Sequence, residues 1–320
     1  MSAAGACFFC VTGRDFFPGA VALVNSLRLH GHSESIIVLD SGMSAGQRGL
    51  IEKEATVTTT PSKLPPSALK LEAPLARPAE VVVMLDADLI VTRPLDDLIA
   101  KAADGTLVAF RNDTQRYFAE WGELLGLGHV RSDPYLTSSA VAVGGEIAEW
   151  LLPAMRRHQA KIDLDHTWLA QGSTNDPFFY FDQDVLNALA HSQLPADDVV
   201  ALDARLAPIP PFSGVRIVDE HALSCDGPGD ARPYLLHHAS HKPWLVRMRS
   251  NVYSRLLTRL LLGSDVSLRL DPQHLPLQLR TGTAARASRT ATDLLLAGPG
   301  LRRRLRGKGK VTPAWPNRSE

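Results

Sequence analysis

Short apolar segments alternate with amphipathic ones along the first half of the chain. The apolar segments have the length of buried strands, and the segments between them repeat apolar residues at helical spacing. This alternation predicts an α/β fold with a mostly parallel, mixed sheet flanked by helices. We expect strands at residues 6–11, 35–40, 81–85, 106–110 and 136–143, and helices at 18–29, 44–55, 65–76, 117–125, 146–159 and 183–190. After residue 211 the pattern loosens, and a strand at 234–238 and a helix at 246–262 stand out.

Composition narrows the possible partners and the compartment. The 320 residues include 34 Lys or Arg and 34 Asp or Glu, and this zero net charge predicts no nucleic acid partner. Three cysteines are too few for a disulfide framework, and Cys7 and Cys10 fall in an apolar strand, where we expect them to behave as small hydrophobes on opposite faces. No apolar run reaches the roughly 18 residues of a membrane span, and the first residues lack the pattern of a secretion leader. We therefore expect a cytoplasmic protein.

Two carboxylates follow the most apolar predicted strand. Asp86 and Asp88 come directly after residues 81–85, and the apolar run 89–91 follows them. Parallel sheets bind ligands beyond the carboxyl ends of their strands, and two carboxylates at this spacing can chelate Mg²⁺ or Mn²⁺ together with phosphate oxygens. The alternative is that an Asp in this place caps the next turn. As exposed groups at a strand end, these side chains should contribute little to stability.

Two further clusters carry possible chemistry. The aromatic run 178–181 leads into Asp182-Gln183-Asp184 at a predicted helix start, where Asp182 either faces the same crevice or caps the helix. The segment 237–244 holds three histidines and a lysine before Pro-Trp. Imidazoles can ligate a metal and an ammonium can neutralise a diphosphate, although histidines also occur on surfaces without a function.

These three motifs, in this order and spacing, resemble those of the retaining glycosyltransferase family that includes glycogenin and bacterial lipopolysaccharide galactosyl- and glucosyltransferases. The resemblance extends over residues 6–244. It implies a GT-A fold, in which one Rossmann-like domain binds a UDP-sugar with Mn²⁺ or Mg²⁺. It also implies a UDP-sugar-dependent hexosyltransferase that retains configuration, acting on an acceptor that the sequence leaves open.

The resemblance assigns roles to individual residues. Contacts to the donor would come from Thr12, Gly13, Asp40, Lys70, Asp86, Ala87, Asp88 and Lys242. Among these, Asp86 and Asp88 would hold the metal, and Lys242 would contact the phosphates. Asp182 and Gln183 would lie beside the sugar ring and anomeric carbon as the catalytic groups.

The chain also departs from the family pattern. The family's last motif is His-x-x-Gly-x-x-Lys-Pro-Trp, but here Leu236 stands at the histidine and Ala239 at the glycine. As third metal ligand we expect His238, because a shortened loop would bring it to the same point, with His237 as second choice. The family's Asn-Ser-Gly strand reads Thr-Ser-Ser at 137–139, which predicts a changed sugar pocket.

Two other functions remain open at this point. The altered histidine motif is compatible with a catalytically silent UDP-sugar-binding protein. A sugar-phosphate nucleotidyltransferase is less favoured, because it would need a Gly-rich loop where residues 11–15 read Val-Thr-Gly-Arg-Asp. A dinucleotide oxidoreductase is disfavoured for a similar reason, since no Gly-x-Gly-x-x-Gly follows a strand.

The end of the chain differs in character from the rest. We therefore expect a nucleotide-sugar-binding and catalytic domain at 1–262 and a Pro/Arg-rich extension at 263–320. Residues 286–310 carry eight Lys or Arg against the single acid Asp293, with leucines interspersed. Such a segment can lie on the anionic inner face of a membrane, which would place the acceptor on or near a lipid. A solvated tail or a subunit interface is the slightly favoured alternative, because Gly298-Pro299-Gly300 interrupts any helix.

Overall fold

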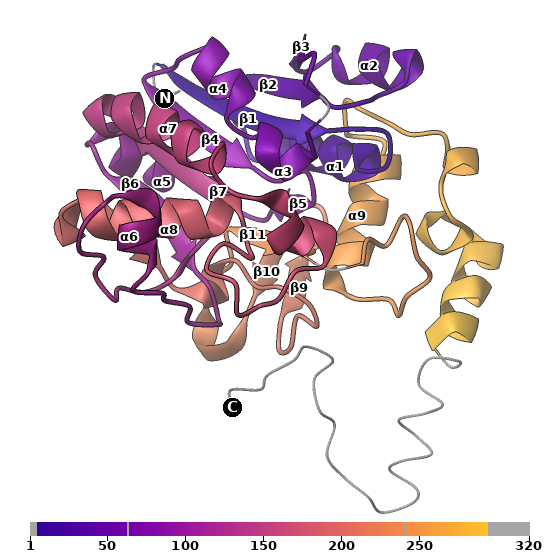
Figure 1. The fold of residues 1–320 in the computed structure, drawn as a ribbon. Helices are drawn as coiled ribbons and strands as arrows, with labels where there is room; N and C mark the ends of the chain where they lie inside the picture. Colours follow the sequence, from indigo (N-terminus) through magenta and orange to yellow (C-terminus); the bar gives the residue numbers. More distant parts are fainter. Residues whose placement is uncertain (1–4, 63, 240, 294–320) are drawn as a thin grey trace, which may run out of the picture.

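A computed structural model describes residues 5–62, 64–239 and 241–293 of the chain (Figure 1). Its centre is a seven-stranded sheet with the strand order β3-β2-β1-β4-β7-β6-β8. The strands of this sheet are β1 (Ala6–Thr12), β2 (Ser35–Asp40), β3 (Thr56–Thr59), β4 (Val81–Leu85), β6 (Leu107–Arg111), β7 (Leu136–Gly144) and β8 (Val199–Leu202). Neighbouring strands are parallel except where β7 pairs antiparallel with β4 and β6. The predicted mostly parallel, mixed α/β sheet is confirmed.

Helices cover both faces of this sheet (Figure 1). One face packs against α1 (Phe17–Leu29), α2 (Ala45–Ile51), α5 (Asp96–Ala103) and α9 (Val252–Leu262). The other packs against α3 (Pro66–Leu69), α4 (Glu72–Ala76), α7 (Gly145–Gln159) and α8 (Asp182–Gln193), and α6 (Trp121–Leu125) lies over α8. Because both faces are covered, the strand residues that point to either face are apolar, which explains the continuous apolar runs in the sequence.

Strand β1 shows this alternation clearly. Phe8 and Cys10 belong to the core on the α1 side, and Cys7 and Phe9 belong to the core on the α7 side. Both cysteines are buried and free, and burial raises the pKa of the Cys7 thiol to about 11. The prediction that they act as small hydrophobes on opposite faces is confirmed.

The order of the strands places one crevice at the centre of the sheet. From β1 the chain runs first to β2 on one side and later to β4 on the other, so the carboxyl ends of β1 and β4 lie together at a switch point. A two-stranded sheet of β5 (Leu89–Val91) and β11 (Leu235–His237) lies next to this point, just after β4. A hairpin of β9 (Arg216–Asp219) and β10 (Ser224–Asp226) precedes β11.

Several predicted helices are shorter than expected, for local reasons. The predicted helix 65–76 is two helices, α3 and α4, because the ring of Pro74 would clash with the carbonyl of Lys70 in a continuous helix. The predicted helix 246–262 begins only at Val252, where the Asn251 side chain accepts from the Ser254 N–H at 2.8 Å and caps it. The predicted helix 117–125 is reduced to α6, which begins at Trp121.

The described part of the predicted extension packs on the main body. Leu268, Leu275 and Leu279 are buried in the same core as α9. The Gln278 amide donates to the carbonyls of Pro243 and Val246 at 2.8 and 2.9 Å. Residues 294–320, with most of the predicted basic segment, lie outside the described residues. No described helix combines the length and the apolar character that crossing a bilayer requires.

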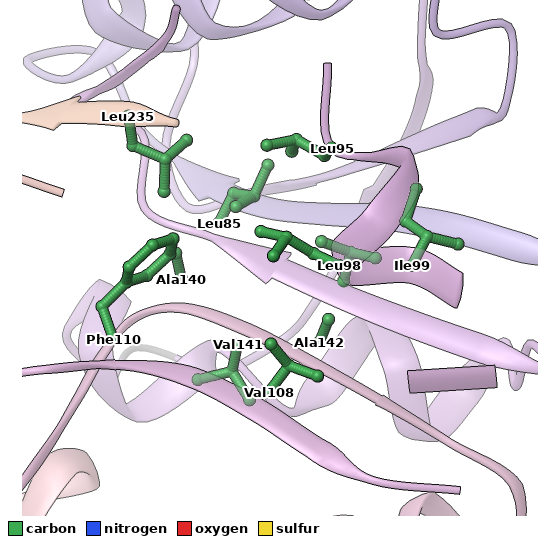
Figure 2. A pocket seen from close by; sticks show the side chains of 11 residues that line it. Leu85, Leu95, Leu98, Ile99, Val108, Phe110, Ala140, Val141, Ala142 and Leu235 are labelled. Atoms are coloured by element: carbon green, nitrogen blue, oxygen red, sulfur yellow. The ribbon is translucent and has the colours of Figure 1, made fainter. Parts of the chain in front are cut away.

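A small cavity lies between β4, β6, β7 and α5 (Figure 2). Its volume is about 10 Å³, and its lining is entirely apolar, with Leu85, Phe110 and Leu235 among the walls. A space of this size and lining is a packing gap that offers nothing to a polar ligand.

Candidate active site

The carboxyl ends of β1 and β4 carry the first site residues. Thr12 ends β1 and Gly13 follows it, and Asp86-Ala87-Asp88 forms the turn between β4 and β5. The Asp86 N–H donates to the Ser139 carbonyl of β7 at 2.8 Å, which fixes the turn to the sheet. The Asp-x-Asp pair therefore lies at the switch point, where the sequence placed it.

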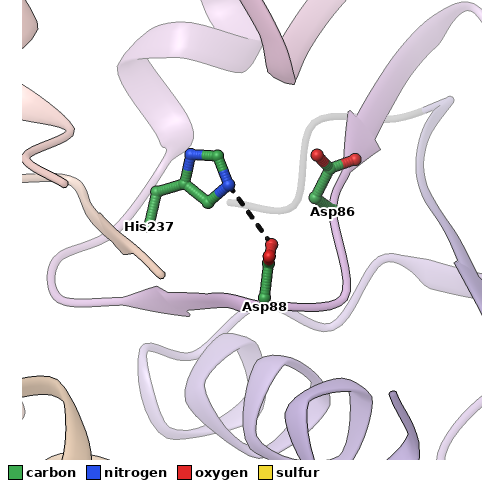
Figure 3. Close-up of side chains that lie close together, drawn as sticks. All are labelled: Asp86, Asp88 and His237. Atoms are coloured by element: carbon green, nitrogen blue, oxygen red, sulfur yellow. Dashed lines mark ion pairs between the residues drawn. The ribbon is translucent and has the colours of Figure 1, made fainter. Parts of the chain in front are cut away.

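Strand pairing brings a histidine to these carboxylates. In the β5–β11 sheet, His237 lies opposite Leu89, directly beside Asp88. Its Nε2 is 3.4 Å from Asp88 Oδ1, and one ligand atom each of Asp86, Asp88 and His237 lies within 4.8 Å of the other two. Figure 3 shows the three side chains converging on one point.

His238, our first choice for a ligand from the sequence, lies elsewhere. Adjacent residues of a strand point to opposite faces, so with His237 turned to the carboxylates His238 turns into the core. Its ring is fully buried between Phe212 and Tyr253, with ring centroids 5.7 and 4.9 Å away. Burial lowers the pKa of His238 to about 4. The second choice, His237, is the histidine that joins Asp86 and Asp88.

Asp88 is built to accept a cation. The expectation that both carboxylates lie exposed is wrong for Asp88, which is only 6% exposed. Burial alone would raise its pKa, but His237 and Lys242 hold the pKa well below the ordinary value, so the group is a carboxylate. Its Oδ2 accepts from Lys242, whereas Oδ1 is buried and makes no hydrogen bond to the described residues, with the His237 imidazole 3.4 Å away. A buried anionic oxygen beside a second carboxylate and an imidazole fits a divalent metal ion.

The Lys-Pro-Trp motif closes the site from the other side. The Lys242 ammonium is buried and donates to Asp88 and to the His238 carbonyl. The Trp244 Nε1–H donates to the Asp15 carbonyl at 2.6 Å, which ties this motif to the loop after β1. Gly19 of α1 lets the ring approach, since a Cβ there would meet the Ala87 carbonyl at 2.3 Å and the ring at 2.7 Å.

Lys70 joins the metal-site carboxylates to the proposed catalytic pair. Its Nζ is 2.7 Å from Asp86 Oδ1 and 2.8 Å from Asp182 Oδ2. Burial disfavours charge on Lys70, but these two carboxylates outweigh it and raise its pKa above the ordinary value. For Asp86, burial is the larger effect and raises the pKa, against the opposing charge of Lys70. The structure thus brings together three residues that the sequence assigned to donor binding and catalysis.

Gln183 lies against the strand that replaces the family's Asn-Ser-Gly. Its side-chain oxygen accepts from the Ser138 N–H at 3.2 Å. The hydroxyls of Thr137 and Ser139 are 3.0 Å apart, and Ser139 is buried. The candidate catalytic residues, Asp182 and Gln183, therefore border the same part of the site as strand β7.

Asp40 has a local structural role. Its Oδ1 accepts from the N–H groups of Gly42 and Met43 at 2.7 and 2.6 Å, and its Oδ2 pairs with Arg48 at 2.6 Å. Thr12 lies beside it in the sheet and is fully buried. The carboxylate holds the turn after β2, and it is not part of the cluster around Asp86.

Two residues that support the arrangement of this site were not identified from the sequence. Arg116 and Tyr135 both donate to Asp184, the residue after Gln183, at 2.8 and 2.6 Å. Arg116 lies in a loop and belongs to no motif. Its ion pair with Asp184 joins residues 68 positions apart and is visible only in the folded chain.

Comparisons with known proteins bear on the fold. No family model and no curated protein matches the sequence. Among solved structures, the bifunctional glycosyltransferase WbbM aligns with a TM-score of 0.54 and 14% identity over 82% of this chain, which spans only 50% of WbbM. The galactosyltransferase LgtC, solved with donor and acceptor sugar analogs, aligns with a TM-score of 0.52 and 14% sequence identity. The alignment covers 81% of this chain and 98% of the LgtC chain. The glycosyltransferase GlyE of Streptococcus pneumoniae TIGR4 aligns with a TM-score of 0.50 and 17% sequence identity, over 81% of this chain and 61% of the GlyE chain. The chain has the GT-A fold.

Proposed function

We propose that this protein transfers a hexose from a UDP-sugar to an acceptor hydroxyl, with a divalent metal and with retention of configuration. The observation that carries the proposal is the convergence of Asp86, Asp88 and His237 at the switch point of a GT-A fold. Lys70, bridging Asp86 to Asp182, extends this cluster to the proposed catalytic residues.

Asp86, Asp88 and His237 would hold the metal. Two carboxylates and an imidazole suit Mn²⁺ better than Mg²⁺, which prefers ligands that are all oxygen. When bound, the ion neutralises negative charge that develops on the diphosphate as the sugar leaves.

The chain's own residues then bind and orient the substrates. Lys242 and Lys70 provide positive charge for the diphosphate, and Asp182 and Gln183 face the sugar. In the transfer, the bond from the anomeric carbon to the UDP oxygen breaks and a bond to the acceptor oxygen forms. The acceptor proton leaves with UDP in a same-face attack, or passes to a base when a side chain first takes up the sugar. Asp182 and Gln183 are our candidates for the nearby group in either route.

Release of UDP tests this function. We expect the purified protein with MnCl2 to release UDP from UDP-glucose, UDP-galactose or UDP-N-acetylglucosamine. Asp88→Asn should lower the rate by about 100-fold or more, because it removes a charged ligand while keeping the shape of the side chain. Asp265→Asn is the matched control, because Asp265 has an exposed side chain that pairs with Arg259 and takes no part in the proposed metal site.

Three results would contradict the proposal and separate its alternatives. Manganese-dependent UDP binding without any release would indicate a silent UDP-sugar-binding protein. Formation of UTP from a UDP-sugar and pyrophosphate would indicate a nucleotidyltransferase. Full activity of Asp88→Asn, or of the wild type in excess chelator, would remove the metal from the mechanism.

We also propose a cytoplasmic location with peripheral contact to the inner face of a membrane. The support is the excess of positive charge among leucines in residues 286–310. The full chain should co-sediment with vesicles containing phosphatidylglycerol at low salt, and the bound fraction should fall as salt is added. Equal binding to purely zwitterionic vesicles, or binding unchanged by removal of residues after 300, would contradict this.

A further inference from the structure

Arg116 lies outside the proposed metal site but is tied to the helix that carries the catalytic pair. Its side chain, only 9% exposed, comes from the segment between β6 and α6. Its Nε donates at 2.8 Å to Asp184 Oδ1, in the first turn of α8. Asp184 is fully buried.

The same guanidinium holds the segment that leads into α8. Its two terminal nitrogens donate to the carbonyls of Thr174, at 2.6 Å, and Asp176. Its plane lies over the rings of Phe118 and Tyr180, 4.4 and 5.3 Å from their centroids. One buried side chain thereby fastens residues 174–180 to the helix that follows them.

Asp184 completes the connection. Its Oδ1 also accepts from the Tyr135 hydroxyl at 2.6 Å, and its Oδ2 accepts from the Tyr180 N–H at 2.7 Å. Burial raises the pKa of Asp184, and Arg116 and these hydrogen bonds counteract it. With both oxygens engaged and no exposure, Asp184 serves as an anchor and has no access to a substrate.

Between Tyr180 and Asp182 the backbone is strained. Phe181 has φ of +45°, in the left-handed region that bulky side chains rarely adopt. Such conformations cost on the order of 1 to 3 kcal/mol and persist where the surroundings determine them fully. Here the Tyr180 N–H is held by Asp184 on one side of the kink, and the Phe181 ring is buried on the other.

We infer that Arg116, acting through Asp184, is a positioning residue that holds this kink and thereby directs Asp182 and Gln183 into the active site. The kink turns the first residues of α8 so that Asp182 reaches Lys70 and Gln183 reaches Ser138. The inference rests on the proposed glycosyl transfer and adds a residue to its machinery. Without the clamp, donor binding through Lys242 and the metal site persists, but the groups beside the anomeric carbon are misplaced.

The test separates positioning from general stability. Arg116→Ala should lower kcat for UDP release by about 10- to 100-fold while KM for the UDP-sugar changes by less than about threefold, the pattern also expected of Asp182→Asn. Millimolar guanidinium chloride should restore part of the lost kcat. Amide hydrogen exchange should accelerate in residues 176–184 and remain unchanged in β1 and β4.

Arg28→Ala is the matched control. Arg28 pairs with Glu54 at 3.1 Å and donates to the carbonyls of His32, Glu34 and Glu54, so it makes the same kinds of contact at the opposite edge of the sheet. We expect it to lower stability without a selective loss of kcat and without rescue by guanidinium.

The outcomes distinguish this inference from the function on which it rests. Unchanged kcat in Arg116→Ala, or a loss that guanidinium does not restore and that Arg28→Ala reproduces, would overturn the inference alone. A wild-type protein that binds Mn²⁺ and UDP but releases no UDP from any donor would overturn the function and the inference together.

Discussion

The alternation of side chains along a strand decides which of two adjacent histidines, His237 or His238, lies beside Asp88. Side chains alternate between faces, and the pairing of β11 with β5 turns His237 towards Asp88 and His238 into an aromatic pocket. The sequence already predicted a strand at 234–238, so alternation limits the ligand to one of the two. Which one it is depends on the register with β5, and register is set by pairing between segments about 146 residues apart.

Replacing each histidine tests this assignment. His237→Ala should weaken Mn²⁺ binding, measured by calorimetry in the presence of UDP, by about tenfold or more, because it removes a ligand. His238→Phe should leave Mn²⁺ affinity unchanged, since its ring nitrogens have no hydrogen-bond partner and a phenyl ring suits the pocket. Loss of metal binding in His238→Phe, with His237→Ala unaffected, would restore our first choice from the sequence.

Other site residues show where reasoning from sequence stops. Asp86, Asp88 and Lys242 belong to ordered motifs that pointed to them, and the structure places them together. The bridge from Lys70 to Asp182 joins residues 112 positions apart, and no pattern within either segment encodes it. Asp40, for which the family resemblance implied a donor contact, has local partners that its position at a strand end did not indicate: the Gly42 N–H and Arg48.

At the scale of elements, helix α1 determines how closely the Asp-x-Asp turn can be packed. Gly19 lies in its first turns, and a methyl group there would meet backbone of Ala87 and the ring of Trp244 well inside contact distance. The helix therefore supports the Asp-x-Asp turn and the Lys-Pro-Trp motif together. A glycine within a helix costs stability by itself, so its presence is explained by this close approach.

A pair of glycine substitutions tests this role of α1. Gly19→Ala should destabilise the fold by about 1 to 3 kcal/mol, as overpacking does, and should weaken Mn²⁺ binding because the turn must move. Gly49→Ala in α2, where a Cβ meets nothing within 4 Å, should be neutral or stabilise by up to about 1 kcal/mol. Urea unfolding and calorimetry measure both effects. A Gly19→Ala protein with unaltered stability and metal affinity would contradict the packing argument.

Several elements with a continuous apolar run were predicted, whereas two elements without one were missed. Strands β1, β2 and β4 lie where their apolar runs predicted them. Strand β3, with the sequence Thr-Val-Thr-Thr, was missed because it forms a half-exposed edge of the sheet and lacks an apolar run. Helix α5 was missed as well, because its buried face rests on only a few residues, Leu98 and Ile99 among them.

At the scale of the whole molecule, the alternation of strands and helices was sufficient to predict the fold class and the place of the Asp-x-Asp turn at the switch point. It was not sufficient for the C-terminal segment. Residues 263–293 are held in part by Asn25, whose side-chain amide donates to the carbonyls of Leu260 and Leu268 at 2.8 and 2.7 Å. The sequence around a polar residue such as Asn25 does not indicate which distant segment will supply its hydrogen-bond partners.

The burial of neutral histidines predicts how the stability of the whole molecule depends on pH. His191 of α8 is 2% exposed, and burial lowers its pKa from an ordinary value of 6.5 to about 4, partly offset by Asp133. Between these two values the unfolded chain binds a proton that the folded chain does not, so stability falls as the pH falls. At pH 5 the loss from this one group is on the order of 2 kcal/mol.

The measurement is urea unfolding of the metal-free protein at pH 7 and pH 5. Between these two conditions the wild type should lose about 2 kcal/mol more than His191→Leu, which carries no proton at either pH and fills a similar buried space. His191 lies away from the proposed metal ligands, so its effect is separate from their titration. Equal losses in wild type and variant would show that His191 is protonated in the folded protein as readily as in the unfolded chain, contrary to its burial. A larger loss in the variant would reverse the sign of the argument.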